Sequence, residues 1–365
     1  MSVAPVVVVG GGTSGSIVAR TLASACAVPV VVVEPGPLTD DDRPRFMDGL
    51  ADDVLWPGDP VPQARALGGG SAVNGMILSG QAPEWLEGLV RTARPGEAGS
   101  VGSALLGAGG RLATMWWNGG RWNPARALLH VVEEGRAVVR RSTVSRLRIV
   151  SGQAAAVVTD EGEIPCSHVV MCAGALRTPQ ILLASGAGER VGQGLQNHPT
   201  VSFTVGRPGP DRGFFDACVV RDLSAGGGTG LMVAFERVSA AEDDAGLVTV
   251  SLMNPRSRGS VGGSVDFGLL SDPEDAARMD MLVARARGVL GEAGLGILAD
   301  SGVHGVSHPS SSCSSSVDGN GRLLGHPNIT VADASVLPSV PDVTPAASVT
   351  IEARRIALSL AKELA

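Results

Sequence analysis

The segment PVVVVGGGTSGSIVARTLA (residues 5–23) decides the fold. Its four valines form a continuous β-branched run, which is typical of a parallel strand buried on both faces. The glycines that follow satisfy the pattern G-x-G-x-x-G, and the apolar residues after them are spaced as on one face of a helix. This order of strand, turn and helix predicts a dinucleotide-binding site.

Each glycine of the pattern has a physical role in such a site. Gly10 permits the tight turn, Gly12 lets the backbone approach a pyrophosphate, and Gly15 lets the helix pack closely on the strand. The phosphates would lie at the helix N-terminus, where free N–H groups and the helix dipole favour anions. A second strand over 28–33 ends at Glu34, which is placed to accept a hydrogen bond from a ribose hydroxyl. A glycine-rich turn without a ligand would not require that acid.

The composition excludes several classes of protein. The chain has 365 residues, of which 44% are hydrophobic and 18% charged, so it is a folded protein long enough for two domains. The net charge of −7 and the absence of Lys/Arg blocks argue against a nucleic-acid partner. Five scattered cysteines without a CxxC pair indicate neither a disulfide framework nor a metal site. No apolar run is long enough for a transmembrane segment, and the first residues do not resemble a signal peptide, so we expect a cytoplasmic protein.

A second glycine-rich stretch, ARALGGGSAVNGMILSG (residues 64–80), indicates which dinucleotide binds. Its glycines allow backbone N–H groups to approach a large planar or phosphorylated ligand. The apolar residues inside it disfavour a simple surface turn. With this stretch the chain resembles the glucose–methanol–choline (GMC) oxidoreductases, which are FAD-dependent alcohol oxidases and dehydrogenases. In that family a loop similar to LGGGSAVNGM packs on the pyrophosphate and the flavin ring.

Further segments resemble the same family in the same order along the chain. They are VVMCAGALRTPQILLASGAG (169–188), GQGLQNHP (192–199), MNPRSRGSV (253–261) and NITVADASVLPSVPDVTPAASVTIEARRIA (328–357). The resemblance implies an α/β fold with a Rossmann-like FAD-binding domain and a second domain built on an antiparallel sheet plus helices. The FAD-binding domain would be discontinuous, over 1–80, 120–200 and 300–365. The substrate-binding domain would cover 200–300, and 81–119 would form a shortened lid or insert.

The sequence patterns within 200–300 agree with that architecture. Four segments alternate apolar and polar residues as antiparallel strands do: VSFTVG, DACVVRD, GLMVAFERV and GLVTVSLM. The glycines at 226–228 mark a hairpin or a loose loop. A helix that starts at Pro273 would lie across the sheet.

The resemblance also implies the residues that contact FAD. These are Gly10, Gly12, Thr13, Ser14, Gly15, Glu34, Gly68, Gly69, Gly70, Ser71, Asn74, Gly75, Ile77, Val144, Ala173, Gly174, Asp333 and Ala334. Some members of the family link FAD through a histidine in the loop that corresponds to 67–80. No histidine is present there, so we expect FAD to be bound non-covalently. An NAD-dependent dehydrogenase is the rival interpretation, and the FAD-type signatures disfavour it.

The segment HPSSSCSSSVD (residues 308–318) resembles the family motif H-x-x-G-T-C, with Ser311 and Ser312 in place of glycine and threonine. The resemblance implies that His308 faces the flavin as general base, a role that suits a group whose pKa lies near neutral pH. His304 is the rival for this role. His304 and His308 are four positions apart, so on a helix they would share one face and could bind a metal. The surrounding glycines and prolines argue against a helix there.

The family usually places a second histidine or an asparagine shortly before the final helix, where this chain has Thr344. Threonine can orient a substrate oxygen, but it cannot act as a base at neutral pH. The remaining histidines are interpreted as structural or surface residues: His130, His168, His198 and His326.

We therefore predict an FAD-dependent oxidoreductase that acts on the CH–OH group of donors, an alcohol dehydrogenase or oxidase. Its partners would be a small-molecule alcohol and either oxygen or a separate electron acceptor. The alternative is a catalytically weakened flavin-binding or redox-partner protein of the same fold. This alternative includes the line of the family that is associated with mycofactocin. The substitutions at Ser311 and Thr344 and the shortened insert motivate this alternative.

Overall fold

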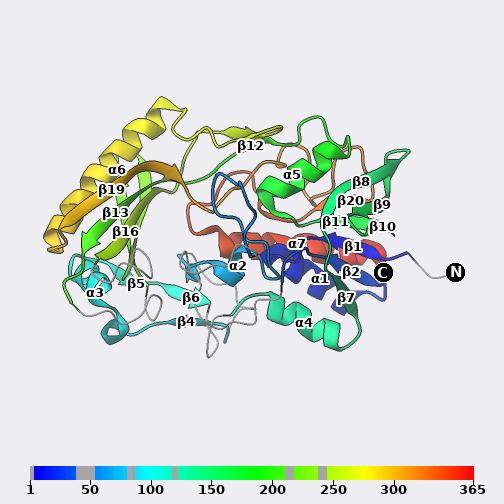
Figure 1. Cartoon of the computed structure of the whole chain (residues 1–365), viewed down its shortest axis with the longest axis horizontal. Helices are drawn as coiled ribbons and strands as arrows, with labels where there is room; N and C mark the ends of the chain where they lie inside the picture. The colour runs from blue at the N-terminus through cyan, green and yellow to red at the C-terminus, as the bar shows by residue number, and fades with distance from the viewer. Residues whose placement is uncertain are drawn as a thin grey trace.

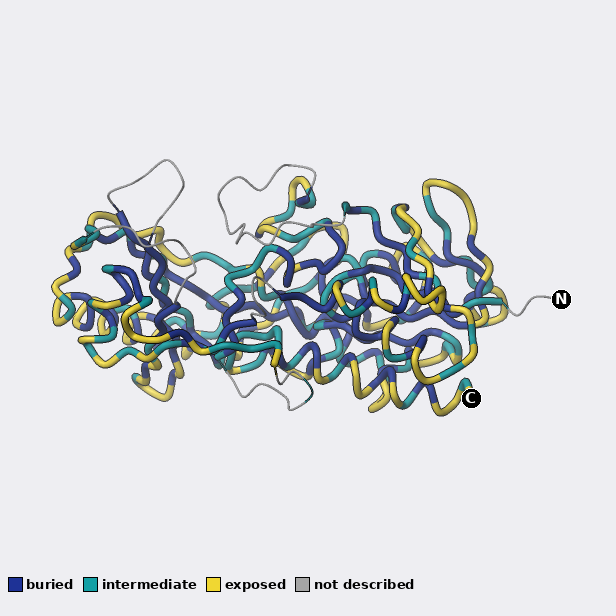
Figure 2. Tube along the Cα trace, turned by 90° about the horizontal axis from the view of Figure 1, so that it is seen from below, coloured by how far each residue is buried: buried dark blue, intermediate teal, exposed yellow. Residues whose placement is uncertain are grey.

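The computed structural model describes residues 4–37, 54–79, 85, 88–116, 122–209, 218–236 and 245–365. The molecule is elongated, with a parallel sheet toward the end that holds both termini and an antiparallel sheet with helix α6 at the opposite end (Figure 1). Buried segments run through both halves, and exposed ones gather on the outer turns (Figure 2). Within the described residues, no helix combines the length and the apolar character that a membrane span needs.

The parallel sheet is assembled from segments that lie far apart in the chain. Its order is β20-β11-β1-β2-β7, and each neighbouring pair is parallel. The strands are β1 (Val6–Val9), β2 (Val30–Val33), β7 (Ala137–Arg140), β11 (His168–Met171) and β20 (Ile329–Val331). The predicted first strand is confirmed, and the second begins two residues later than predicted.

Both faces of this sheet are buried, which explains the continuous valine runs. Val6 and Val8 pack in one cluster with residues of three helices, and Val7 and Val9 pack in another on the opposite face. The first face is covered by α1 (Thr13–Ala25), α4 (Ala125–Glu133) and α7 (Pro345–Leu364). The second is covered by α5 (Gly174–Ala184) and by the antiparallel strands β8 (Val144–Val150), β9 (Gln153–Thr159) and β10 (Gly162–Pro165) (Figure 1).

The large antiparallel sheet has the order β19-β13-β16-β15-β14-β5. Its strands are β19 (Ile297–Gly305), β13 (Pro199–Gly206), β16 (Ala245–Leu252), β15 (Gly228–Phe235), β14 (Val219–Ala225) and β5 (Arg111–Leu112). The predicted hairpin is confirmed, since Gly226 and Gly227 have positive φ between paired residues Ala225 and Gly228. Such backbone favours glycine.

Helix α6 (Pro273–Glu292) packs on one face of the antiparallel sheet, as the sequence predicts. Its N-terminus is capped by Asp272, whose carboxylate accepts a hydrogen bond of 2.8 Å from the Glu274 amide. Val248 and Val250 face α6, while Val233 and Leu247 lie in a different cluster on the other side of the sheet. The sheet therefore has two apolar faces, and α6 packs on the one that carries Val248 and Val250.

Smaller elements connect the two halves. Two further sheets consist of β12 (Gln193–Leu195), β17 (Gly259–Val261) and β18 (Val265–Asp266), and of β3 (Ile77–Leu78), β6 (Thr114–Trp116) and β4 (Val90–Thr92). Short helices are α2 (Gly70–Val73) and α3 (Ser100–Gly107), with 3-10 turns over Pro95–Glu97 and Ala334–Val336. β5, from the predicted insert, pairs with the edge of the large antiparallel sheet. The domain boundaries proposed from the sequence remain a prediction.

Candidate active site

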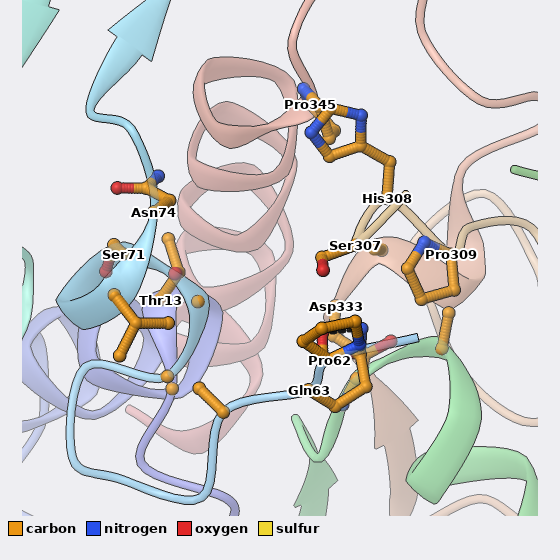
Figure 3. Close-up of a pocket in the computed structure, with 18 of the residues that line it drawn as sticks. Thr13, Pro62, Gln63, Ser71, Asn74, Ser307, His308, Pro309, Asp333 and Pro345 are labelled. Carbon is orange, nitrogen blue, oxygen red and sulfur yellow. Dashed lines mark hydrogen bonds between the residues drawn. The ribbon is translucent and has the colours of Figure 1, made fainter. Parts of the chain in front are cut away.

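A cavity of about 900 Å³ lies between the two halves of the molecule. Glycine-rich turns after β1 and around α2 line one side, and side chains of β15, β16 and the loop after β19 line the other. Its size lies within the range of ligand and cofactor sites. Figure 3 shows Thr13, Ser71 and Asn74 on one side of this cavity, opposite Ser307, His308 and Pro309.

The turn after β1 can be built only with glycine. Gly10 has a φ of +96°, and a Cβ there would lie 2.6 Å from the carbonyl oxygen of Cys172. A Cβ on Gly15 would lie 1.9 Å from the carbonyl oxygen of Gly10, so any side chain would push α1 away from β1. Gly15 itself does not line the cavity, and its role is the close packing of helix on strand.

The N-terminus of α1 opens into the cavity. Gly12 is its N-cap and makes no side-chain capping bond, and the first amides of a helix have no partner within the helix. Gly12, Thr13 and Ser14 all line the cavity. Free N–H groups and the helix dipole at this position favour an anion such as a pyrophosphate.

Glu34, at the end of β2, is buried and lines the same cavity. Its two carboxylate oxygens accept hydrogen bonds from the amides of Gly11 (2.8 Å) and Gly36 (2.9 Å). Burial raises the pKa of Glu34 above its usual value, and these bonds oppose the shift. Each oxygen keeps a lone pair that can accept from a ribose hydroxyl.

The second glycine loop packs directly on the first. The amide of Gly68 donates to the carbonyl of Gly11 (2.8 Å), and a Cβ on Gly69 would lie 2.8 Å from the Cα of Gly12. Gly68 itself faces Asn123 and does not line the cavity. A Cβ on Gly70 would meet no described atom within 4 Å, so this backbone borders open space.

The other residues predicted to contact FAD come together around the same space. Apart from Gly15 and Gly68, every one of them lines the cavity, including Val144 on β8 and Ala173 and Gly174 at the start of α5. Asp333 is buried and joins the start of α5 to the 3-10 turn Ala334–Val336. It accepts hydrogen bonds from Gly174 N (2.9 Å), Thr178 Oγ1 (2.6 Å) and Ser335. Bare backbone, an uncapped helix and a carboxylate with free lone pairs are the groups that a dinucleotide needs, so the residues present fit FAD.

His308 lies across the cavity from the glycine loops (Figure 3). Its Nδ1 lies 3.0 Å from Nδ1 of His198, and the two rings are nearly perpendicular, at 87°. Burial lowers the pKa of His308 to about 3 and that of His198 to about 4, so both rings are neutral near pH 7. Nε2 of His308 makes no hydrogen bond with any described residue and is open to the cavity.

The contact of His198 with His308 was missed by the sequence analysis, which interpreted His198 as structural or as a surface residue. His198 is fully buried, and its Nε2 lies 2.9 Å from the carbonyl oxygen of Pro341. The only signal was its place in GQGLQNHP, one of the segments that resemble the family. Nothing in the sequence brings residues 198 and 308 together, since they lie 110 positions apart.

His304, the rival base, also lines the cavity, but both of its nitrogens are engaged. Nε2 lies 2.9 Å from Ser202 Oγ, and Nδ1 lies 3.0 Å from the carbonyl oxygen of Gly305. His304 is on strand β19 and His308 is in the loop that follows, so the two are not on one helix face. Among the described residues, no group of three or more His, Cys, Asp or Glu is arranged to hold a metal.

Thr344 lines the cavity immediately before α7, and its hydroxyl is already bonded. Oγ1 donates to the carbonyl of Ile77 (2.9 Å) and accepts from the amide of Ser79 (3.1 Å). The Thr344 amide in turn donates to Ser79 Oγ (2.7 Å). Thr344 therefore joins the start of α7 to the end of β3.

The serine run is part of the folded core. Ser310, Ser311 and Ser312 have no exposed surface, and Ser312 Oγ donates to the carbonyl of Ala175 (2.6 Å). Ser311 has a φ of +72°, a conformation that favours glycine, and its Oγ is buried without a partner. A serine-rich linker would show neither the burial nor these bonds.

The other three histidines have structural or surface roles. His130 is exposed beside Glu134, with Nε2 3.2 Å from its carboxylate. His168 is buried, and its Nε2 lies 2.9 Å from Thr330 Oγ1. His326 Nδ1 lies 2.9 Å from the carbonyl oxygen of Gly152.

Comparisons with solved structures agree with this fold. Solved structures with a similar fold include a pyridoxine 4-oxidase from Mesorbium loti, with a TM-score of 0.82, 18% identity and 99% of each chain covered. A formate oxidase from Aspergillus oryzae RIB40 has a TM-score of 0.79, 17% identity and 100% of each chain covered. An FAD-dependent oxidoreductase from Chaetomium thermophilum has a TM-score of 0.78 at 17% identity, with 98% of this chain and 99% of that one covered.

Sequence comparisons identify the family. Over 98 residues the chain is 35% identical to an uncharacterized GMC-type oxidoreductase, y4nJ, of Sinorhizobium fredii, a match that covers 24% of this chain and 19% of that protein. Two family models described as GMC oxidoreductase match residues 102–200 and 246–353, which together make up more than half of the chain. This chain belongs to the GMC oxidoreductase family of FAD-dependent oxidoreductases.

Proposed function

We propose that this protein oxidises the CH–OH group of a small alcohol to a carbonyl, with His308 as general base. The observation that carries the proposal is the His308 imidazole, whose Nε2 is open to the cavity, opposite two glycine loops that fit FAD. FAD, when bound, accepts two electrons and the hydrogen from the carbinol carbon and passes the electrons to oxygen or a separate acceptor.

The residues proposed to hold FAD divide by function. The amides at the start of α1 and the backbone of Gly69 and Gly70 would bind the pyrophosphate. Glu34 would accept from the ribose hydroxyls, and Val144 would contact the adenine. No histidine lies in 67–80, which supports non-covalent binding.

His308 would take the proton of the substrate hydroxyl. As the carbinol hydrogen leaves with its electron pair, positive charge develops on the substrate, and loss of the hydroxyl proton to Nε2 leaves a neutral carbonyl product. The ring must be neutral to accept that proton, and burial favours the neutral form. The same burial lowers the pKa to about 3, below the near-neutral value expected from the sequence, and makes the ring a weaker base. We therefore expect the proton to move only as the carbinol hydrogen leaves, when the hydroxyl becomes more acidic. The resulting imidazolium would carry the proton until solvent or the next step removes it.

Thr344 is proposed to orient the substrate oxygen. Its hydroxyl already makes hydrogen bonds within the protein, and these limit what it can donate to a substrate. The hydroxyl has one hydrogen, which it gives to the carbonyl of Ile77. To donate to a substrate oxygen, Thr344 would have to turn that hydrogen away from Ile77. This cost favours a secondary role for Thr344 beside His308.

The lining of the substrate side supports an uncharged alcohol with an apolar body. Among the described residues, β15 and β16 contribute four apolar side chains to the cavity wall, Leu231, Val233, Phe235 and Leu247, and β16 adds the uncharged side chains of Thr249 and Ser251. A charged group placed against these side chains would lose its hydration without a partner. Hydrocarbon next to the carbinol carbon would instead gain from burial.

The test is the absorbance of the FAD-loaded protein during anaerobic addition of single alcohols. We expect the flavin bands to bleach with apolar primary or secondary alcohols, such as benzyl alcohol or 1-hexanol, with formation of the corresponding carbonyl. Choline and glucose serve as charged and strongly polar controls. Loaded protein whose bands stay unchanged with every alcohol would contradict the proposal. Readmission of oxygen then distinguishes an oxidase, which recovers its colour quickly, from a dehydrogenase.

The second candidate is a catalytically weakened flavin-binding or redox-partner protein. The engaged hydroxyl of Thr344 favours it, because the family's second catalytic position is then without a free donor. Such a protein would bind FAD and exchange electrons with a partner, yet it would not be reduced by alcohols. The same titration separates the two candidates.

A further inference from the structure

We propose that His198 is a positioning residue that sets the tautomer of His308, so that Nε2 of His308 presents a lone pair to the cavity. The proposal rests on the proposed role of His308 as general base. It is carried by one chain of contacts: the Pro341 carbonyl, the His198 ring and the His308 ring.

The positions of the hydrogens follow from these contacts. A carbonyl oxygen can only accept, so Nε2 of His198, 2.9 Å from the oxygen of Pro341, carries a hydrogen. A neutral imidazole has one N–H, so Nδ1 of His198 is an acceptor. Nδ1 of His308, 3.0 Å away, must then be the donor. The remaining nitrogen of His308, Nε2, is left with a free lone pair.

These hydrogen positions hold only when both rings are neutral, and the surroundings of the rings favour the neutral forms. Burial lowers the pKa of each ring, while the backbone groups of Pro341 and Met253 and the charge of Asp342 oppose the shift at His198. A proton on either ring would also repel a proton on the other. Near pH 7 the pair therefore holds two hydrogens, one on each ring.

The chain around His198 is built to hold this geometry. Gln196 exchanges two backbone hydrogen bonds of 3.0 Å with Ser310, just beyond His308. The side chain of Asn197 donates to the carbonyl of Val306 (2.6 Å) and accepts from the His198 amide (2.9 Å). Gln196 Oε1 also accepts from the amide of Val340, next to Pro341. Residues 196–198 thus hold the loop of His308 and the segment of Pro341 in place around the His198 ring.

The functional consequence is that the nitrogen of His308 that faces the cavity is always the proton acceptor. If His308 carried its hydrogen on Nε2, it would point a donor at the substrate oxygen and could not accept the hydroxyl proton. His198 excludes that tautomer because its Nδ1 needs a donor. When His308 takes up the proton, its Nδ1–H still donates to neutral His198. The arrangement resembles an orienting carboxylate in geometry, with a neutral acceptor in its place.

Two substitutions separate the two contacts of His198. In asparagine the amide atoms are bonded to Cγ, as is Nδ1 of histidine, so His198→Asn can still accept from His308. In glutamine they lie one bond further out, like Nε2, so His198→Gln can still donate to Pro341 but offers His308 no acceptor. FAD content and thermal unfolding of both variants identify general damage to the fold.

The direct measurement is the nitrogen-15 NMR spectrum of histidine-labelled, FAD-loaded protein, with the His308 signals assigned by their loss in His308→Gln. We expect His308 to be protonated at Nδ1 in the wild type and in His198→Asn, and to gain Nε2 protonation in His198→Gln. A wild-type His308 protonated at Nε2 would overturn the proposal, and so would an unchanged tautomer in a folded His198→Gln. This readout does not require turnover, so it stands even if no alcohol is oxidised.

Reduction kinetics supply the second readout once an alcohol is found. His198→Gln should slow flavin reduction about 10²-fold, while His198→Asn should stay within about tenfold of the wild type. The difference should appear in the limiting rate and not in the substrate concentration at half-saturation. Equal rates in the two variants would show that the His198–His308 contact does not direct the base.

Discussion

The two sides of the cavity are built on opposite principles. The side proposed for the dinucleotide is made of backbone: Gly10, Gly12 and Gly70 present main-chain atoms, and Gly15 and Gly69 have no room for a Cβ. The side proposed for catalysis is made of side chains, with His308 and Val233 coming from separate parts of the chain. A backbone site depends on where side chains are absent, whereas a side-chain site depends on which distant segments meet.

The largest expected effect comes from the first side. Gly15→Ala would place a Cβ 1.9 Å from the carbonyl of Gly10, so we expect a loss of about 3 kcal/mol or more in the free energy of unfolding. Gly70→Ala is the matched control, since its Cβ meets no described atom within 4 Å and should change stability by less than about 0.5 kcal/mol. It should instead weaken FAD binding, because the methyl group enters the space of the ligand. Denaturant unfolding of the apo-proteins and FAD titration measure the two effects, and equal losses of stability would contradict this view of the loops.

The two faces of the antiparallel sheet offer a second comparison. Val248→Thr would put a hydroxyl into the core against α6, and should cost about 1–3 kcal/mol of stability. Val233→Thr makes the same change on the cavity face, and should spare stability while weakening binding of apolar alcohols by about 1 kcal/mol, about fivefold. Unfolding midpoints and substrate saturation curves would test this. A Val233→Thr protein with unchanged saturation would indicate that substrate does not contact β15.

A buried histidine outside the site should make stability depend on pH. Burial lowers the pKa of His168 to about 4, whereas the ring titrates near 6.5 in the unfolded chain. The unfolded state therefore binds more protons between these values, so this contribution is fully present above about pH 6.5 and is lost as the pH falls toward 4. Replacing the ring with glutamine should flatten the decline by an amount on the order of 1–3 kcal/mol. If His168→Gln unfolds with the same pH slope as the wild type, the ring does not titrate as stated.

The smallest expected effect concerns the serine run. Ser311 has positive φ and a buried hydroxyl without a partner, so Ser311→Gly should stabilise the protein by about 1 kcal/mol. Ser312→Ala is the opposite control, because it removes the bond to Ala175 and should destabilise by about 1 kcal/mol. Thermal unfolding of both variants decides the matter. A destabilised Ser311→Gly would mean that the hydroxyl has a partner or fills needed space.

These contrasts explain what could be predicted from the sequence. The glycine turns are local, because the missing Cβ atoms belong to a few consecutive residues. The first two strands of the parallel sheet and the glycine loops that fit FAD could therefore be predicted from the sequence. His308 could be named because it stands in a motif that resembles the family's. The role of His198 could not be predicted, because it depends on a contact with His308, 110 positions away in the sequence. The hydrogen bonds of the Thr344 hydroxyl could not be predicted for the same reason, because Ile77 and Ser79 are more than 260 positions away in the sequence.

The proposed function requires that His308, and not His304, accepts the substrate proton. The most direct measurement is the rate of anaerobic flavin reduction by an accepted alcohol in the wild type, His308→Gln and His304→Gln. We expect that all three proteins bind FAD, that flavin reduction in His308→Gln is slowed by about 10²–10⁴-fold, and that His304→Gln stays within about tenfold of the wild type. Reduction of His308→Gln at the wild-type rate would contradict the proposed role of His308.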